Sequence, residues 1–436
     1  MKRDLDLVVW GATGFTGELA VAYLKGDQSK LSSFRCDDPA APADLCWAVC
    51  GRNRAKLSAL DAGVEIIVCD ADDRGGIESF VKRTRVVIGL AGPFHRYSDR
   101  VVEACAKYGT HWCDVSGEIP WMRSLIDRYG EQARASQACI VNQCGYDSIP
   151  SDLGTLFAVN ALQSRHLEHS VDNEPKAPVR AATCYQIGLG GIGGGSLQTV
   201  IDYTTPPVAL AADVDPDDPF LVGGGPQEGV RNEDGPMVRA YFDSELDTWV
   251  GPFGMASVNR RIVHRSNMQL GYGPQFGYQE VEVCYSEEQA QQLVYKLDNP
   301  NPPEFFIESI ESGRLPRPGQ GPSLEERAKR CFLSTLVAVN EAGDDVAVTI
   351  TGGDASFEET AKMVVEAGLA LVYDSASCPG VLSGGGFLTP AACMGTTLID
   401  RLHRAGIKFE VVSDATGTAS LHARNAIADF KKRQTE

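Results

Sequence analysis

The first 150 residues alternate between two hydrophobic periods. Short apolar runs rich in β-branched residues are typical of buried parallel strands. They recur at 5–10, 45–52, 64–73, 85–94, 111–118 and 138–143. Apolar positions at helical spacing separate several of these runs, as at 99–109 and 122–137. Strands that alternate with helices predict a Rossmann-type, doubly wound parallel sheet in a domain of residues 1–150.

Beyond residue 150 the regular alternation is lost. The pattern predicts a helix at 151–162 (capped by Ser151 or Asp152), a strand at 179–188, a helix at 196–203, a half-buried strand at 343–354 and an amphipathic helix at 357–374. Thr389 and Pro390 are typical of the cap and first turn of a further helix, which precedes a final strand. We therefore expect a second α/β (or α+β) domain at 151–385 and a helix–strand segment at 386–436.

The stretch "GATGFTG" places three glycines between the first strand and the first helix. Gly11 permits a tight turn, Gly14 lets the backbone approach a pyrophosphate, and Gly17 lets helix and strand pack closely. Amides at the helix N-terminus would then face the phosphates. The alternative is a glycine turn that binds nothing. The residues predicted to hold a dinucleotide here are Gly11, Thr13, Gly14, Phe15, Thr16 and Gly17.

The end of the second strand indicates which dinucleotide is bound. An NAD-specific turn usually carries an acid that binds the ribose 2′-hydroxyl, but residues 51–56 contain none. Arg52, with Arg54 beside it, could instead bind a 2′-phosphate through paired N–H donors. We therefore expect NADP(H) in preference to NAD(H). The alternative is a solvated basic turn.

Other strand ends supply further candidates for the cofactor site. Asp70 is a candidate contact for the adenine amine, or else a helix cap, a role that Asp72 or Asp73 could also fill. Small residues would let a nucleotide lie across the carboxyl ends of the strands. They are Ala91, Gly92, Pro93 and Gly145.

Hydride transfer to a substrate also needs a proton donor near the strand ends. The candidates chosen are Tyr97, Tyr146 and Asp147, with the tyrosines requiring a charge that lowers their pKa. His95, Ser116, Glu118 and Ser148 lie in the same loops. Asp114 and Glu118 could form an inward carboxylate pair, although such residues more often brace loops.

Composition limits the classes of function. The 436 residues carry a net charge of −18, and no basic patch is evident, so we expect no nucleic-acid partner. The 13 cysteines include no CxxC pair, and we expect no metal site. No apolar run is long enough to span a membrane. The chain runs from Met1 directly into a strand without a cationic, apolar leader, so we expect a cytoplasmic protein.

Two motifs of the second domain have open interpretations. The glycine-rich stretch 188–195 is a mobile loop near the active site or a second phosphate loop. The segment 259–266 holds the richest basic cluster, in which Arg261 and Arg265 share a helix face. It binds an anionic part of the substrate, or forms salt bridges with acidic surroundings.

Six motifs resemble, in the same order, those of the saccharopine dehydrogenase-like oxidoreductases, a group that includes trans-acting enoyl reductases. They are "GATGFTG", "CGR", "AGPF" with Tyr97, "THWCDVSGE", "CGYDSIPSDLG" and "GGGFLTPAACMG". The resemblance implies nicotinamide-dependent redox chemistry and a chain end, 386–436, that packs back on the first domain. Saccharopine itself is not the expected substrate, because the glycine spacing is GxxGxxG and the basic side chains that this substrate needs cannot be assembled in one pocket.

The expected function is NADP(H)-dependent reduction of an enoyl or carbonyl group on a lipophilic or thioester-linked substrate. The alternative is a catalytically weak protein that binds NADP(H) or a lipid and has a regulatory or lipid-associated role. The family also admits peripheral contact with a membrane, organelle or lipid droplet. A homodimer is a further expectation.

Overall fold

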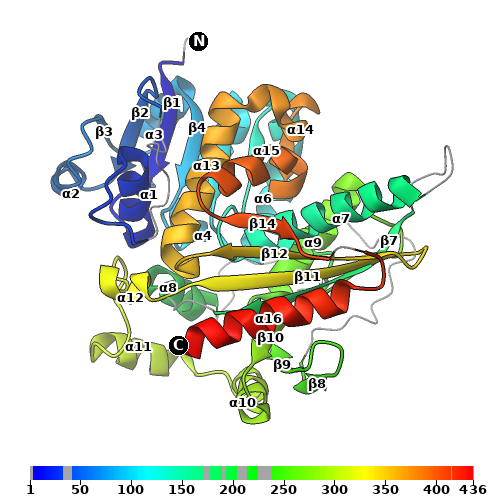
Figure 1. The fold of residues 1–436 in the computed structure, drawn as a ribbon. Helices are drawn as coiled ribbons and strands as arrows, with labels where there is room; N and C mark the ends of the chain where they lie inside the picture. Colours follow the sequence, from blue (N-terminus) through cyan, green and yellow to red (C-terminus); the bar gives the residue numbers. More distant parts are fainter. Residues whose placement is uncertain are drawn as a thin grey trace.

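The computed structural model describes residues 3–32, 42–169, 177–188, 193–203, 214–215, 217–223, 238–413 and 415–435. Two seven-stranded sheets organise these residues. In Figure 1 the first sheet stands in the upper part of the molecule, and the second crosses the lower half behind the C-terminal helix.

The first sheet is entirely parallel, in the order β13-β6-β5-β4-β1-β2-β3. Its strands are β1 (Leu5–Trp10), β2 (Trp47–Gly51), β3 (Glu65–Val68), β4 (Thr84–Gly89), β5 (His111–Asp114), β6 (Cys139–Val141) and β13 (Gly386–Leu388). The central strands are apolar and almost wholly buried because helices cover both faces. The predicted doubly wound parallel sheet is confirmed.

Two layers of helices enclose this sheet. One layer contains α3 (Arg74–Arg83), α5 (Asp99–Tyr108) and α6 (Ile119–Ser136), which pack on one another. The other contains α1 (Phe15–Lys25) and α13 (Thr360–Tyr373), with α15 (Pro390–Arg404) against α13. The short helices α2 (Arg54–Ala59), α4 (Phe94–Tyr97), η2 (Ser375–Ser377) and α14 (Pro379–Leu382) complete this half.

The second sheet is mixed, in the order β14-β12-β11-β7-β10-β9-β8. Only β7 and β10 pair in parallel. Its strands are β7 (Val179–Ile187), β8 (Tyr241–Asp243), β9 (Thr248–Pro252), β10 (Gly277–Cys284), β11 (Phe332–Asn340), β12 (Asp345–Gly352) and β14 (Lys408–Val411). The strands predicted at 179–188 and 343–354 correspond to β7 and β12. They pair with β11 on its two sides.

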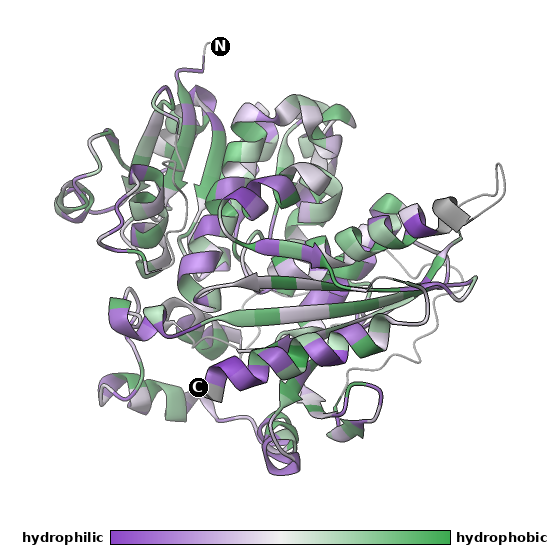
Figure 2. Ribbon diagram, viewed as in Figure 1, coloured by the Kyte–Doolittle hydropathy of each residue, from purple (hydrophilic) through white to green (hydrophobic). Residues whose placement is uncertain are grey.

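Helices also cover the second sheet. α7 (Ile149–His169) packs on β11 and β12, and α16 (Ala419–Thr435) packs on the same two strands. Figure 2 shows apolar and polar positions alternating along α16, whose buried side includes Ala423, Ile427 and Phe430. The remaining helices are α8 (Gly194–Tyr203), α9 (Ala256–Leu270), α10 (Glu287–Asp298), α11 (Pro303–Glu311), α12 (Leu324–Ala328) and the π-helical turn η1 (Ala355–Glu359).

A helix does form within 357–374, but the expectation that it has a polar face toward solvent is wrong. Every residue of α13 from Thr360 to Val372 is buried, including Lys362 and Glu366. The helix follows β12 of the second sheet but packs on α1, β4 and β5 of the first half, so it lies between the two halves (Figure 1). Its polar side chains face other helices rather than solvent: the Glu366 carboxylate accepts from the Tyr23 hydroxyl (2.8 Å) and pairs with Arg401 (2.7 Å).

The chain end is divided between the two halves, which corrects the expected return of 386–436 to the first domain. β13 extends the first sheet beside β6, but β14 pairs with β12 and α16 lies on the second sheet. The reason is that β14 pairs with the edge of β12, and α16 buries an apolar face on the second sheet. Thr389 does cap α15 by accepting from the amide of Ala392 (3.1 Å).

None of the helices in the described part of the chain is long and apolar enough to cross a membrane. The described cysteines are all free thiols, most of them buried.

The buried pair between α13 and α15 gives a stability prediction. Arg401→Leu should lower the free energy of unfolding by about 3–5 kcal/mol, because it leaves the Glu366 carboxylate buried without its cation. The double variant Arg401→Leu/Glu366→Gln should lose less, since a neutral amide needs no counter-charge and still accepts from Tyr23. Urea denaturation of both variants checks this, and a double variant less stable than the single one would contradict it.

Candidate functional site

The three glycines of the first turn meet different neighbours. Gly11 has a φ of +84°, and a Cβ there would lie 2.5 Å from the amide nitrogen of Ala91. A Cβ at Gly17 would collide with the carbonyl oxygen of Gly11 and lie 2.8 Å from the carbonyl carbon of Ala12. A Cβ at Gly14 would meet nothing closer than 3.4 Å. Gly11 and Gly17 are therefore required by packing, whereas a Cβ at Gly14 would make only ordinary van der Waals contacts at the start of α1.

This turn fits a diphosphate. Gly14 is the N-cap of α1, and the amides of the first helical turn have no acceptor inside the helix. The side chains of Thr13 and Thr16 are half-buried beside them. The ring of Phe15 points elsewhere: it packs edge-on against Phe357 at 5.3 Å between centroids. Phe15 can therefore offer a ligand only its backbone amide.

The end of β2 brings two distant residues together. The Arg52 guanidinium lies over the ring of Tyr97, 5.8 Å from its centroid. Arg52 and Arg54 are exposed, while Asn53 caps α2 by accepting from the amide of Lys56 (3.0 Å). Tyr97 thus stands beside the residue expected to bind the adenosine, on the side away from β5 and β6.

The aspartates that follow β3 have different roles. Asp73 caps α3 by accepting from the amide of Gly76 (2.9 Å). Asp70 accepts only from the amide of Asp72 (3.1 Å) and remains exposed. Of the three aspartates weighed as caps, Asp73 therefore takes that role, and Asp70 stays a candidate for the adenine contact.

The residues after β4 allow two strand ends to approach. Ala91 lies against Gly11, and Gly92 is followed by a cis peptide bond to Pro93. The Ser98 hydroxyl donates to the carbonyl of Ala91 (3.2 Å). The small residues expected here thus pack directly beside the glycine turn.

His95 sits between two carboxylates. Its Nδ1 lies 2.7 Å from Glu118, and its Nε2 lies 3.5 Å from Asp202 of α8. Glu118 also accepts from the amides of Phe94 (2.7 Å) and His95 (3.0 Å), so it fixes the start of α4. All three side chains are nearly buried, which makes this a rigid junction between the two halves.

Asp114 braces the loops that follow β5 and β6. Its carboxylate accepts from the Trp112 indole (2.7 Å), the Asn142 amide (2.6 Å) and the backbone of Ser116 (3.0 Å). Desolvation raises its pKa to about 6, against these hydrogen bonds. Asp114 and Glu118 therefore hold loops in place and do not form an inward pair. The Ser116 hydroxyl is likewise internal, because it accepts from the amide of Glu118 (3.1 Å).

Gln143 is a site residue that the sequence did not reveal. It follows β6 with a left-handed φ of +62°, a conformation that costs energy in a non-glycine residue. Its side chain is buried, and its Nε2 has no partner among the described residues. A strained backbone with an unpartnered buried amide at a strand end points to a ligand. No sequence signal beyond its place before "CGYDSIP" marks it.

Gly145 and Tyr146, which follow shortly after Gln143, have different roles. A Cβ on Gly145 would lie 3.0 Å from Thr360 and 3.1 Å from Val115, so this glycine serves packing. The Tyr146 hydroxyl donates to Gln186 in the second sheet (3.3 Å), away from the strand ends. Burial, above all, raises the pKa of Tyr146 well above its usual value, which is the opposite of the expected lowering.

Asp147 is accessible although it lies deep in the protein. Its side chain is exposed, while desolvation by the surrounding protein raises its pKa to about 6. The neighbouring Ser148 is buried, and its hydroxyl donates to Asn259 (2.8 Å). Asp147 is therefore the one chosen acid candidate that combines access with a pKa near neutrality.

The basic cluster on α9 faces both backbone carbonyls and acidic residues: Asp215, Asp217 and Asp218 interact electrostatically with Arg261. Arg265 is buried and donates to the carbonyls of Val222 and Phe387 (2.7 Å to the latter). Arg261 donates to the carbonyl of Asp218 (3.0 Å). These guanidinium groups bind backbone oxygen atoms, and so hold the returning chain end. Asp152 does not cap α7: it accepts from Ser266 and from the amide of Ala391 (2.8 Å).

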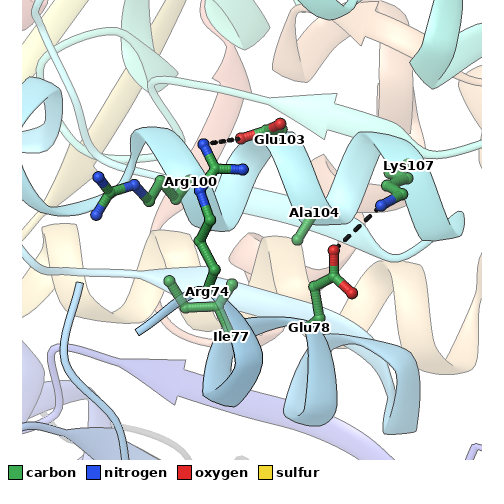
Figure 3. A pocket seen from close by; sticks show the side chains of 7 residues that line it. All are labelled: Arg74, Ile77, Glu78, Arg100, Glu103, Ala104 and Lys107. Carbon is green, nitrogen blue, oxygen red and sulfur yellow. Dashed lines mark hydrogen bonds and ion pairs between the residues drawn. The ribbon is translucent and has the colours of Figure 1, made fainter. Parts of the chain in front are cut away.

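The glycine-rich loop expected in the second domain is described only in part. In the glycine-rich stretch 188–195, residues 189–192 are outside the described residues. Figure 3 shows a surface groove of about 50 Å³ between α3 and α5, crossed by the pairs Arg74–Glu103 and Lys107–Glu78. It is too small for a nucleotide. Within the described residues, no cluster of side chains is arranged to hold a metal ion.

Comparison with known proteins agrees with this geometry. Residues 7–141 match the family model described as the saccharopine dehydrogenase NADP binding domain. Through this domain the chain is similar to the saccharopine dehydrogenase-like oxidoreductases. A putative trans-acting enoyl reductase of Mycobacterium tuberculosis is 29% identical over 94% of this chain and 97% of its own length. A trans-acting enoyl reductase of Mycobacterium leprae is 28% identical over 93% and 97%.

Among solved structures, apo saccharopine dehydrogenase (L-Glu forming) of Saccharomyces cerevisiae aligns with a TM-score of 0.49 and 14% identity, over 94% of this chain and 100% of its own. Homospermidine synthase of Legionella pneumophila in complex with NAD gives 0.46 and 11%, over 94% and 92%. The family model makes residues 7–141 a nicotinamide-dinucleotide-binding domain, and the enzyme is an oxidoreductase.

The glycine turn yields a prediction that separates packing from ligand binding. Gly17→Ala should lower the free energy of unfolding by about 1–3 kcal/mol, because its Cβ collides with backbone. Gly14→Asp should keep the stability, since aspartate is a favoured N-cap and its Cβ would make only ordinary contacts, but should abolish dinucleotide binding by repelling phosphate. Thermal unfolding and a fluorescence titration with NADPH measure the two effects. Unchanged NADPH affinity in Gly14→Asp would show that the phosphates bind elsewhere.

Proposed function

We propose that this oxidoreductase uses NADPH to reduce an enoyl or carbonyl group on a lipophilic or thioester-linked substrate. The glycine turn carries this proposal, together with the accessible Asp147 near the strand ends. The relatives named enoyl reductase support the reaction class, since they match this chain along almost its whole length.

Residues on three strand ends would hold the cofactor. Backbone amides at Phe15 and Thr16, in the first turn of α1, would bind its diphosphate, and Arg52 its 2′-phosphate. Tyr97 is reassigned here from proton donor to the adenosine end, because it stacks with Arg52. We also propose that the domains of the chain are divided near residues 150 and 385.

The cofactor supplies a hydride to the electrophilic carbon, and a proton must reach the α-carbon of an enoyl group or the oxygen of a carbonyl. We assign this proton to the Asp147 carboxyl, which is partly protonated near neutral pH. The unpartnered Gln143 amide would donate a hydrogen bond to the bound cofactor or substrate. His95 is less suited to this proton transfer, because both its ring nitrogens face carboxylates.

The test of the function is direct. Purified protein is titrated with NADPH while nicotinamide fluorescence is recorded, and NADPH oxidation is then followed with a panel of enoyl thioesters and aldehydes. Saturable binding with turnover of a panel member is the expected result. Absence of binding below millimolar concentration in folded protein would refute the proposal. Binding without turnover would favour a non-catalytic NADP(H)-binding role.

Cofactor preference is tested at Arg52. Arg52→Asp should weaken NADPH binding by about ten- to a hundredfold, because it removes a charge-assisted contact to the 2′-phosphate. NADH binding should change much less. Lys56→Asp, at another exposed position of the same segment, controls for the general loss of positive charge. An equal weakening of both cofactors in Arg52→Asp would contradict the assignment.

The proton donor is tested by its pH profile. Because the acid form of Asp147 donates and its pKa is about 6, kcat/KM for reduction should fall as the pH rises through that value. Asp147→Asn should lower kcat/KM at least about a hundredfold at pH 6 and remove this dependence. His95→Gln serves as the comparison variant and should keep the pH profile. A profile lost in His95→Gln and kept in Asp147→Asn would reverse the two roles.

A further inference from the structure

A larger cleft lies apart from the strand ends of the first sheet. Its volume is about 700 Å³, and none of the predicted cofactor residues lines it. It opens between the chain just after α1, the junction of α12 with β11, the end of β12, the turn from α15 to β14, and the last turns of α16. The buried rings of Phe332 and Phe430 form part of its wall.

The lining of this cleft is strongly cationic. Only one carboxylate lines it, that of Glu359, which pairs with a lysine of the lining at 2.7 Å. The cationic residues are Lys329, Arg330, Lys362, Arg404, Lys408 and Arg433. They come from four separate segments, in a chain whose net charge is −18. Gathering like charges in one cleft raises the energy of the folded protein unless an anion binds there.

Some of these cations are already neutralised, and others are not. Lys329 pairs with Glu325 (2.8 Å), and Arg330 pairs with the buried Asp354 (3.2 Å). Lys408 donates to a backbone carbonyl, that of His403, at 3.0 Å. Neither Lys408 nor Arg433 forms an ion pair with any carboxylate in the described part of the chain. The cleft therefore retains positive charge on its two exposed rims, β14 and α16.

We propose that this cleft binds a phosphorylated small molecule of about nucleotide size, at a site separate from the glycine turn. Its volume falls in the range of small-molecule sites. Guanidinium and ammonium groups that converge from several directions suit a phosphate, which presents acceptor oxygens on all sides. The cations line a recess and do not form an extended stripe, so the arrangement suits a compact anion better than a nucleic-acid backbone.

The cleft also touches the element that covers the glycine turn. Arg330 lies over the ring of Phe357 at 5.9 Å, and Phe357 packs on Phe15 at the start of α1. These basic side chains are gathered away from the predicted cofactor residues. This proposal stands independently of the proposed reaction.

Calorimetry with sodium pyrophosphate tests the proposal in the full chain carrying Gly14→Asp, so that the glycine turn contributes no phosphate site. Saturable binding to this variant is expected. Adding Lys408→Glu and Arg433→Glu should weaken it at least about tenfold. Adding Lys296→Glu and Arg239→Glu instead, which makes the same charge change at exposed positions outside the cleft, should leave it within about twofold.

Three results would overturn the proposal: no saturable binding to Gly14→Asp, equal weakening by both pairs of substitutions, or weakening by the control pair alone. If the Glu pair fails to fold, as judged by circular dichroism, Lys408→Gln/Arg433→Gln replaces it with the same expected direction. Pyrophosphate affinity that is insensitive to that milder pair would also overturn the proposal.

Discussion

The burial of α13 on all sides is the constraint on which the arrangement of the molecule depends. This helix leaves the second sheet at β12 and packs on β4, β5 and α1 of the first half. An apolar helix with no solvent face cannot shift without losing contacts on both sides. Its position therefore fixes how the second half meets the carboxyl ends of the parallel strands. The turn η1 just before it carries Phe357 onto Phe15, beside the glycine turn.

The same helix also positions the loop that bears the proposed acid. The Thr360 hydroxyl, at the start of α13, accepts from the amide of Tyr146 (3.1 Å), and its methyl group would meet any side chain at Gly145. Asp114 holds the other side of this loop through the amide of Gln143 (3.2 Å). Desolvation raises the pKa of Asp114 and Asp147 alike, but only Asp147 is open to a ligand. Asp114, which is held by hydrogen bonds, therefore braces the loop, whereas Asp147 is free to exchange a proton.

Local patterns explain which features could be predicted from the sequence. The strands of the first sheet are short apolar runs with turns between them, and the glycine turn is defined by three neighbouring positions. The sequence pattern does not predict β11, because its partners β7 and β12 are set by pairing across the fold. The spacing of Arg261 and Arg265 indicated a shared helix face but not the backbone carbonyls opposite it. The left-handed φ of Gln143 leaves no trace in composition or period.

The two anion sites inferred here rest on different physics. At the glycine turn, attraction comes from backbone amides and the helix dipole, which act only at short range and need Gly14 to remain without a side chain. In the cationic cleft, attraction comes from side-chain charges on separate segments, which are screened by salt and tolerate a less defined ligand geometry. The net charge of −18 makes the protein as a whole repel anions, so both sites need local attraction. Because Phe357 contacts Phe15 on one side and Arg330, which lines the cleft, on the other, an anion in the cleft would lie near the same short turn that covers the start of α1.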